Sequence, residues 1–276
     1  MKLLWQEIFT KEIPFTDESE RVWNAIRQII EAVKSDDTTV EQRWLSRSSE
    51  LNWYPYLEIL NNAEIIDGII RGEQEGYDAA VIDCYCDPGL NAARGVVDIP
   101  VVGLSESAMM AAQAVGAKFA CVTVWEDYIP IMERNIRLYG WEQRAISRKP
   151  VRHFDLDWGA FISALKGDGD EIVDRFNEVA LSCIEDGADT VIAGCGYLSP
   201  ALKLLGCRFV GKSRVPVVDC VSTAVVMAEA LASLRQGTGL SPSRSGGSPY
   251  PEPPKKKLRQ IRERFGFEDF TGTTGG

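Results

Sequence analysis

Short apolar runs alternate with longer amphipathic stretches along the first 235 residues of the chain. Six of the runs, rich in Val, Ile and Ala, are typical of parallel strands buried on both faces: 2–5, 79–83, 101–103, 118–124, 190–193 and 215–219. Between them, apolar residues at helical spacing predict helices over 18–34, 61–74, 106–114, 128–138, 168–186 and 223–235. Strands that alternate with helices in this way predict an α/β protein with mostly parallel sheets.

This pattern contains an internal repeat. The segment GYDAAVIDCYCDPGLNAARG, from Gly76, matches GADTVIAGCGYLSPALKLLG, from Gly187, since each begins Gly-x-Asp and continues through a Val-Ile run to a cysteine. Further along, IPVVGLSESA (99–108) matches VPVVDCVSTA (215–224), and upstream MKLLWQEI parallels AKFACVTV. Landmarks that recur in the same order predict two homologous, pseudo-symmetric lobes, each with a mostly parallel sheet flanked by helices, and a cleft between them.

The repeat gives two cysteines equivalent positions. Cys84 and Cys195 each follow a predicted strand and precede a helix, which Asp87 is expected to cap in the first copy and Ser199 in the second. Open α/β sheets bind ligands at the carboxyl ends of their strands. The N–H groups at the two helix starts are expected to lower the pKa of both thiols and to hold a bound carboxylate or oxyanion.

Two thiols on opposite walls of one cleft suit proton transfer at a carbon next to a carbonyl. One thiolate removes the α-proton and the other thiol returns a proton to the opposite face, without any cofactor. A disulfide, a metal site built from Cys84, Cys86 and Cys195, and unrelated core cysteines are the alternatives. The shared offsets of Cys84 and Cys195 favour the proton-transfer pair, with no metal.

Composition narrows the class of protein further. A net charge of −10 disfavours binding to nucleic acid or to an anionic membrane. No stretch approaches the roughly 20 apolar residues of a membrane helix, and the first residues lack a signal-peptide pattern, so the default expectation is a cytoplasmic location. Seven cysteines, an odd number, favour free thiols. His153, the only histidine, lies in a polar stretch between predicted elements and is expected at the surface.

The last part of the chain, 241–276, has a different composition. It is rich in Gly, Ser and Pro and has a basic segment at 255–264. We expect an extension that wraps the surface and carries no chemistry. Its Phe265, Phe267 and Phe270 are candidates for contact with a neighbouring subunit.

The residues around the two cysteines resemble the aspartate/glutamate/hydantoin racemase superfamily. Cys84-Tyr85-Cys86-Asp87-Pro88-Gly89-Leu90 is similar to the Cys-x-x-Asp-Pro-Gly-Leu hallmark of its hydantoin and allantoin racemase branch, and Gly194-Cys195-Gly196 is similar to the second motif. The resemblance implies two lobes, 1–103 with 221–240 and 104–220, and a homo-oligomer. It also implies Cys84 and Cys195 as catalytic acid and base, no cofactor, and a small-molecule substrate. The substrate-binding candidates are Gln6, Tyr85, Cys86, Asp87, Thr123, Gly196 and Tyr197.

The chain departs from that branch at several positions. It reads WQEIF after the first strand, where the branch has Asn-Pro-Asn, and Gln6 is the candidate for the missing amide. Cys86 stands where glycine is usual, and Tyr197 and Leu198 replace small residues, so we expect a reshaped pocket. The leading hypothesis is a racemase of a hydantoin-like cyclic ureide or an amino acid. The alternatives are a decarboxylase or cis–trans isomerase on the same scaffold, and a non-catalytic binding protein.

Overall fold

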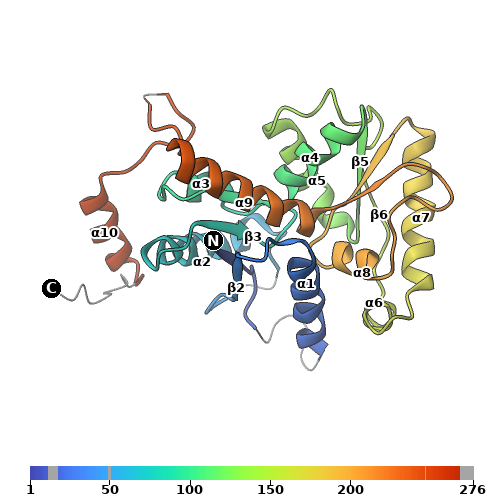
Figure 1. Cartoon of the computed structure of the whole chain (residues 1–276), viewed down its shortest axis with the longest axis horizontal. Coiled ribbons are helices and arrows are strands. Elements are labelled where there is room, and N and C mark those ends of the chain that lie inside the picture. Colours follow the sequence, from blue (N-terminus) through green and yellow to red (C-terminus); the bar gives the residue numbers. More distant parts are fainter. Residues whose placement is uncertain (12–17, 49–50, 246, 268–276) are drawn as a thin grey trace.

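The computed structural model describes residues 1–11, 18–48, 51–245 and 247–267. In this part of the chain, eight strands form two four-stranded parallel sheets, with the orders β2-β1-β3-β4 and β6-β5-β7-β8 (Figure 1). The strands are β1 (Lys2–Gln6), β2 (Thr39–Arg43), β3 (Ala79–Ile82), β4 (Val101–Gly103), β5 (Phe119–Thr123), β6 (Val151–His153), β7 (Thr190–Ala193) and β8 (Val217–Asp219). Since the second order repeats the first, the predicted pseudo-symmetric α/β fold is confirmed.

Six of the ten helices in the described part of the chain lie where the amphipathic stretches predict them, with shifted ends, and those over 90–94, 158–165, 198–204 and 255–264 lie outside the predicted ranges. The ten are α1 (Ser19–Val33), α2 (Pro55–Gln74), α3 (Leu90–Arg94), α4 (Leu104–Val115), α5 (Ile129–Leu138), α6 (Trp158–Leu165), α7 (Asp170–Glu185), α8 (Leu198–Leu204), α9 (Cys220–Thr238) and α10 (Lys255–Arg264), with a 3-10 turn, η2 (Glu126–Tyr128), before α5. Among these described residues, no helix is long and apolar enough to cross a membrane.

Two strands escape the sequence pattern. β2 and β6 each lie at one edge of their sheet and are paired on one side only. Unlike β4, which is fully buried at the opposite edge of the first sheet, they carry polar residues that are partly exposed, as in TVEQR of β2, so they lack the continuous apolar run of a buried strand. The placement of His153 between elements is therefore wrong, because this residue ends β6 and is half-buried.

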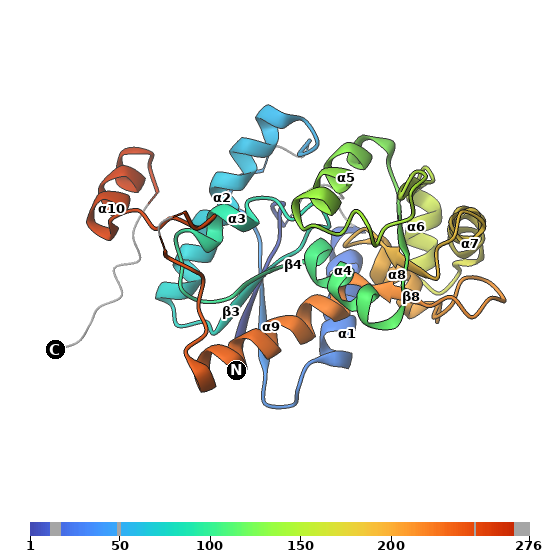
Figure 2. The ribbon, with the colours of Figure 1, turned by 90° about the horizontal axis from the view of Figure 1, so that it is seen from above.

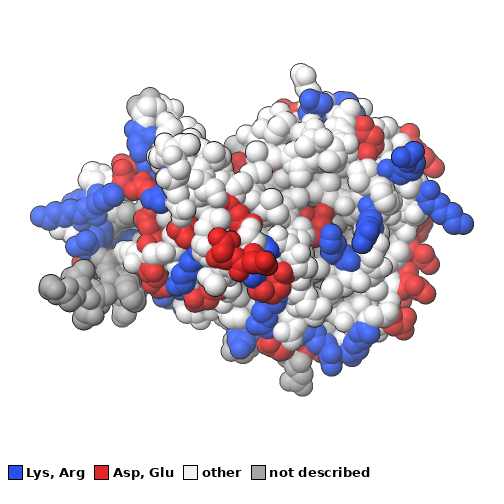
Figure 3. Space-filling view, viewed as in Figure 1, with Lys and Arg blue, Asp and Glu red and all other residues white. Residues whose placement is uncertain are grey.

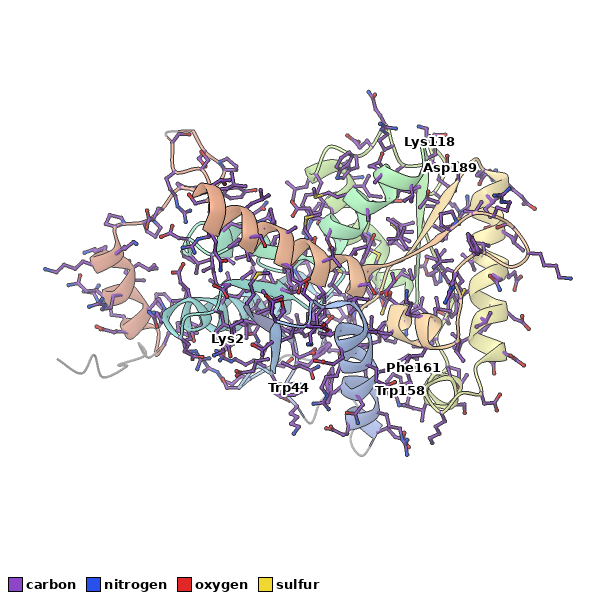
Figure 4. All side chains as sticks on the ribbon, in the orientation of Figure 1. Lys2, Trp44, Lys118, Trp158, Phe161 and Asp189 are labelled. Carbon is purple, nitrogen blue, oxygen red and sulfur yellow. The ribbon has the colours of Figure 1, made fainter. Side chains whose placement is uncertain are left out.

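The repeated Gly-x-Asp motif has the same structural role in both lobes. The Asp78 carboxylate accepts a hydrogen bond from the backbone N–H of Lys2 (2.8 Å), and Asp189 accepts one from that of Lys118 (2.9 Å). Figure 4 shows Asp189 beside Lys118, at the start of β5. The first glycine of each motif has a positive φ, 83° and 99°, which an L side chain would strain. Each motif thus ties the start of one inner strand to the start of the next.

Two helices cross between the lobes. α4 follows β4 of the first sheet but packs against β7 and β8 of the second. α9 follows β8 of the second sheet and packs against β3 and β4 of the first, on the face opposite α2 (Figure 2). One apolar core continues from the first sheet into the second, and a smaller core lies within the second lobe. The exact boundaries of the lobes stay a prediction.

The described part of the extension wraps the first lobe. Arg244 donates hydrogen bonds to the backbone oxygens of Arg94 and Val97, both at 2.6 Å. Arg262 of α10 forms a buried ion pair with Asp67 of α2 (2.5 Å). Figure 3 shows basic side chains gathered over α10, at one end of the molecule, and a mixture of both charges elsewhere on the visible face. Phe270 lies outside the described residues.

Candidate active site

A cavity of about 430 Å³ opens where the loops after β1, β3, β5 and β7 meet. These are the two inner strands of each sheet. Because parallel strands carry their carboxyl ends to the same edge, both sheets direct their loops toward this one space. Its volume is in the range of small-molecule sites.

Seven of the nine predicted site residues line this cavity. Both cysteines are among them, one from the loop after β3 and the other from the equivalent loop after β7. The seven are Cys84, Tyr85, Cys86, Thr123, Cys195, Gly196 and Tyr197. Gln6 and Asp87 are not among the lining residues.

Gln6 lies beneath α2, away from the cavity. It is 1% exposed, and its amide donates to the backbone oxygens of Glu7 (2.9 Å) and Arg43 (3.3 Å). A Cβ on Gly68 of α2 would lie only 2.3 Å from the Gln6 Oε1 atom, so α2 sits directly on this amide. Gln6 therefore holds strand to helix in this structure.

Asp87 caps a different helix from the expected one. Its carboxylate accepts hydrogen bonds from the N–H groups of Ser105 and Glu106 (both 2.9 Å), at the start of α4, and from the Tyr139 hydroxyl (2.7 Å). The predicted cap on the helix after Cys84 is wrong, because that helix, α3, begins at Leu90. Asp87 instead fixes the crossing helix α4, and three donors already occupy its carboxylate.

In the second lobe, two residues together hold the start of the crossing helix α9. Ser199 is inside α8, not at its cap as expected, and its hydroxyl donates to Asp219 (2.7 Å). Asp219 in turn accepts from the N–H groups of Val221 (3.0 Å) and Ser222 (3.3 Å), at the start of α9. A carboxylate therefore holds the first turn of each crossing helix, beside each cysteine loop.

Burial dominates the electrostatics of Cys195. It raises the pKa of this thiol to about 11, although the N–H groups of Leu198 and Tyr197 lower it. The expectation of a lowered pKa is therefore wrong for Cys195. A negative charge on Cys84 also raises the pKa of Cys195, so the two sulfurs are near enough to interact.

Cys84 has donors of its own. The backbone N–H of Cys86 donates to the Cys84 sulfur at 3.4 Å. A side-chain hydrogen bond to Cys84 and burial raise the pKa of Cys86 well above its ordinary value, so Cys86 stays a thiol that can donate. Asn135 of α5 holds this loop from the other lobe by donating to the Cys86 carbonyl (2.9 Å).

The disulfide and the metal site, two of the alternatives for the cysteines, can be compared with the structure. All seven cysteines are among the described residues, and all are free thiols. Within the same part of the chain, no group of three or more His, Cys, Asp or Glu side chains is arranged to hold a metal ion. Cys121 and Cys183 are fully buried in the core.

Two buried carboxyl groups at the cavity escape the sequence analysis. Asp83 follows β3 and lines the cavity, though it is only 3% exposed, and Glu7 follows β1 and is fully buried. Burial raises the pKa of Asp83 to about 7, while the nearby Trp5 and Glu7 side chains lower it. Burial and the Asp83 charge raise the pKa of Glu7 well above its usual value. The sequence does contain a signal, since an acid ends each of two buried strands.

Glycines on both sides of Cys195 let the two cysteine loops approach each other. A Cβ on Gly196 would lie 2.8 Å from a carboxylate oxygen of Asp83, and one on Gly194 would lie 3.3 Å from the Tyr85 ring. The first contact is closer than real Cβ atoms come to a neighbour. Asp83 of the first lobe therefore lies directly against the Cys195 loop of the second.

Aromatic side chains close the cavity across the two lobes. Trp53 lies before α2 and Tyr128 in η2, and their ring centroids are 5.6 Å apart in an edge-on arrangement. The Tyr128 hydroxyl donates to the Asn52 side chain (2.7 Å), which joins the two lobes at this wall. Phe9 and Tyr197 also line the cavity, and their ring centroids are 6.4 Å apart.

Comparison with known proteins now assigns the family. The family model described as Asp/Glu/Hydantoin racemase matches residues 17–228, more than half of the chain. The chain belongs to this racemase family. It is 34% identical to a hydantoin racemase of Pseudomonas sp. (strain NS671) over 220 residues, 78% of this chain and 80% of that protein. It is 35% identical to a hydantoin racemase of Rhizobium meliloti over 185 residues, 66% of this chain and 70% of that one.

Solved structures agree with this family. The allantoin racemase from Klebsiella pneumoniae superposes with a TM-score of 0.72 at 26% identity, covering 92% of this chain and 95% of that one. The resemblance to the hydantoin and allantoin branch is confirmed.

The charged side chains that line the cavity of this racemase-family member are all acidic. No Lys, Arg or His is among the described residues that line the cavity, which has two acids, buried Asp83 and exposed Asp127. The rest of the wall is mostly apolar and aromatic. An anionic ligand would therefore find no cationic side chain to pair with, whereas an uncharged one would be desolvated at little cost.

Proposed function

We propose that this racemase-family protein inverts a carbon next to a carbonyl, with Cys84 and Cys195 as the base and the acid, and without a cofactor. The observation that supports this most is the placement of the two thiols. Equivalent loops of two pseudo-symmetric lobes bring them to one cavity, and a negative charge on Cys84 raises the pKa of Cys195.

The surroundings of the two thiols suggest their starting roles. Cys195 keeps its proton, because burial raises its pKa to about 11. Negative charge on Cys84 is stabilised by the N–H and the thiol of Cys86. In one direction the Cys84 thiolate takes the α-proton, the electron pair moves into the enolate, and the Cys195 thiol gives its proton to the opposite face. The cycle ends with the charge on Cys195, and the reverse reaction restores it to Cys84.

The charge of the cavity favours a neutral substrate. Free amino acids and malonates carry carboxylates, which the lining offers no cation to bind. A 5-substituted hydantoin is uncharged, has an acidic α-carbon, and can place an apolar substituent among the aromatic rings. The names of two similar curated relatives, both hydantoin racemases, support the same substrate class.

Hydrogen–deuterium exchange followed by NMR tests this proposal. In D₂O, the wild-type protein should put deuterium at the α-carbon of 5-benzylhydantoin while optical rotation is lost. Cys84→Ser and Cys195→Ser should each lower the rate at least about 100-fold, because each removes one partner of the proton transfer. Cys207→Ser, at a cysteine outside the cavity, is the matched control and should keep the rate.

Other outcomes would replace the proposal. Loss of CO₂ from a substituted malonate that needs only one of the two cysteines would establish a decarboxylase. Ligand binding without any exchange, unchanged when both thiols are replaced, would establish a binding protein.

We also propose that the protein forms a homo-oligomer. Large apolar side chains gather exposed around the start of α2: Leu51, Tyr54, Tyr56, Ile59 and Leu60. Such a patch is typical of an interaction surface. Light scattering after size exclusion should give a multiple of 30.6 kDa, and a monomer mass would refute the proposal.

A further inference from the structure

We propose that Asp83 is the specificity-determining residue of the cavity, whose carboxylate accepts a hydrogen bond from a ring N–H of an uncharged substrate. This inference rests on the proposed function for the substrate class. It adds a residue that neither cysteine motif predicts.

The first support is the position of Asp83. Its side chain is 3% exposed, and what remains accessible faces the cavity. In the described part of the chain, no N–H or hydroxyl group donates to either of its oxygens in normal hydrogen-bond geometry. A carboxylate can accept about four hydrogen bonds, and one left without them inside a protein is costly. Asp83 is therefore an acceptor that a ligand can satisfy.

Glu7, a second buried carboxyl group, lies next to Asp83 and stabilises its negative charge. Burial and the neighbouring Asp83 raise the pKa of the buried Glu7 carboxyl well above its usual value, which favours its protonated form. On the other side Glu7 accepts from the Gln42 amide (2.5 Å). Above about pH 7 the pair thus carries one negative charge, and Gln42 and Glu7 direct that charge toward Asp83 and the cavity.

Asp83 lies next to both proposed catalytic cysteines. It precedes Cys84 in the chain, and its carboxylate touches the position of Gly196, next to Cys195. A ligand bound to Asp83 is therefore held between the two cysteine loops. In a hydantoin ring, one N–H is bonded directly to the α-carbon. A hydrogen bond from the ring to Asp83 would thus orient the reacting carbon relative to both sulfurs.

Binding measurements without turnover test the inference. The Cys84→Ser protein is titrated with 5-benzylhydantoin and with its 1-methyl and 3-methyl derivatives, and quenching of tryptophan fluorescence is followed, since Trp53 and Trp125 line the cavity. One of the two methyl derivatives should bind roughly 10- to 100-fold more weakly, because a hydrogen bond to a charged group is lost.

Adding Asp83→Asn to this protein completes the test. The parent ligand should now bind roughly 10- to 100-fold more weakly, while the sensitive methyl derivative loses no further affinity. This non-additivity identifies Asp83 as the partner of that N–H. Asp127→Asn, at the exposed acid of the same cavity, should leave the discrimination between the parent and the methyl derivatives unchanged.

Three results would overturn the inference: equal binding of all three ligands, full additivity of methylation with Asp83→Asn, or no binding of the parent. The methylation arm needs no change at Asp83, so misfolding of that variant cannot hide the answer. The proposed function fails separately. If the wild-type protein shows no α-proton exchange while the Asp83 coupling holds, the cavity binds such rings but does not racemise them.

Discussion

Asp83→Asn should stabilise the folded protein at pH 8, even though we expect it to weaken ligand binding. In the unfolded chain an aspartate releases its proton near pH 3.8, whereas burial holds the pKa of Asp83 at about 7 in the folded protein. Between these two values the unfolded state has lost the proton and the folded state retains it. The free energy of unfolding of the wild type therefore falls as the pH rises from about 4 to 7. Asparagine has no proton to lose, so the variant escapes this fall.

The size of the effect follows from the two pKa values. Each pKa unit corresponds to about 1.4 kcal/mol, so the shift from 3.8 to about 7 costs the folded wild type at most about 4 kcal/mol above pH 7. At pH 5 only about a third of this cost is present. The advantage of the variant should thus grow by about 2–3 kcal/mol between pH 5 and pH 8. For a chain of this size that is roughly 5–10 °C in Tm.

Thermal unfolding, followed by tryptophan fluorescence at pH 5, 6, 7 and 8, measures this difference. Asp36→Asn, at an exposed acid, is the control and should show a constant difference from the wild type. A difference between Asp83→Asn and wild type that stays flat, or shrinks, from pH 5 to 8 would refute the reasoning. It would mean that Asp83 is charged in the folded protein throughout this range.

Three further changes have expected outcomes. Gly196→Ala should lower kcat/KM by roughly 10- to 100-fold, because its Cβ would lie 2.8 Å from Asp83 and push the two cysteine loops apart; steady-state polarimetry measures this. Asp87→Ala should lower the free energy of unfolding by about 1–2 kcal/mol, because α4 loses its cap, as urea denaturation would show. Arg262→Ala should cost about 1.5–3 kcal/mol and speed proteolysis of the extension, because Asp67 loses a buried partner.

Each of these has a matched control. Gly237→Ala, in α9, has no atom within 4 Å of its new Cβ and should keep activity. Asp36→Ala removes an exposed acid and should leave stability nearly unchanged, as should Lys256→Ala on the outer side of α10. Full activity of Gly196→Ala would show that the loops tolerate a wider spacing. Unchanged unfolding of the other two variants would show that neither contact stabilises the fold.

The sequence predicts most of the scaffold because buried parallel strands and amphipathic helices have distinct patterns. The internal repeat adds long-range information, since it pairs Cys84 with Cys195 and thereby predicts the two sides of the cavity. The two strands that it misses each lie at one edge of a sheet. β2 and β6 are half exposed, so their polar residues resemble those of loops.

The caps and the carboxyl pair depend on contacts that the sequence does not show. Asp87 directly precedes Pro88, the arrangement expected of an N-cap, yet α3 begins only at Leu90 and Asp87 holds α4, because the chain turns back at Gly89, where φ is 71°. Glu7 and Asp83 are far apart in the sequence, and only the pairing of β1 with β3 brings them together. The pKa of Cys195 likewise depends on burial, which a helix start alone does not indicate.

Because α9 covers one face of β3 and β4, the first lobe stays unfinished while the second is being synthesised. At normal rates of translation, the apolar face of its sheet stays uncovered for on the order of ten seconds or more, until residues 220–238 have left the ribosome. The same exchange of α4 and α9 is what two copies of an ancestral half-chain would show if each lent its last helix to the other. Such a swapped dimer already has a cleft between two identical loops, and its formation depends on concentration. Fusion of the two copies into one chain removes that dependence and lets each copy of the cysteine loop diverge on its own.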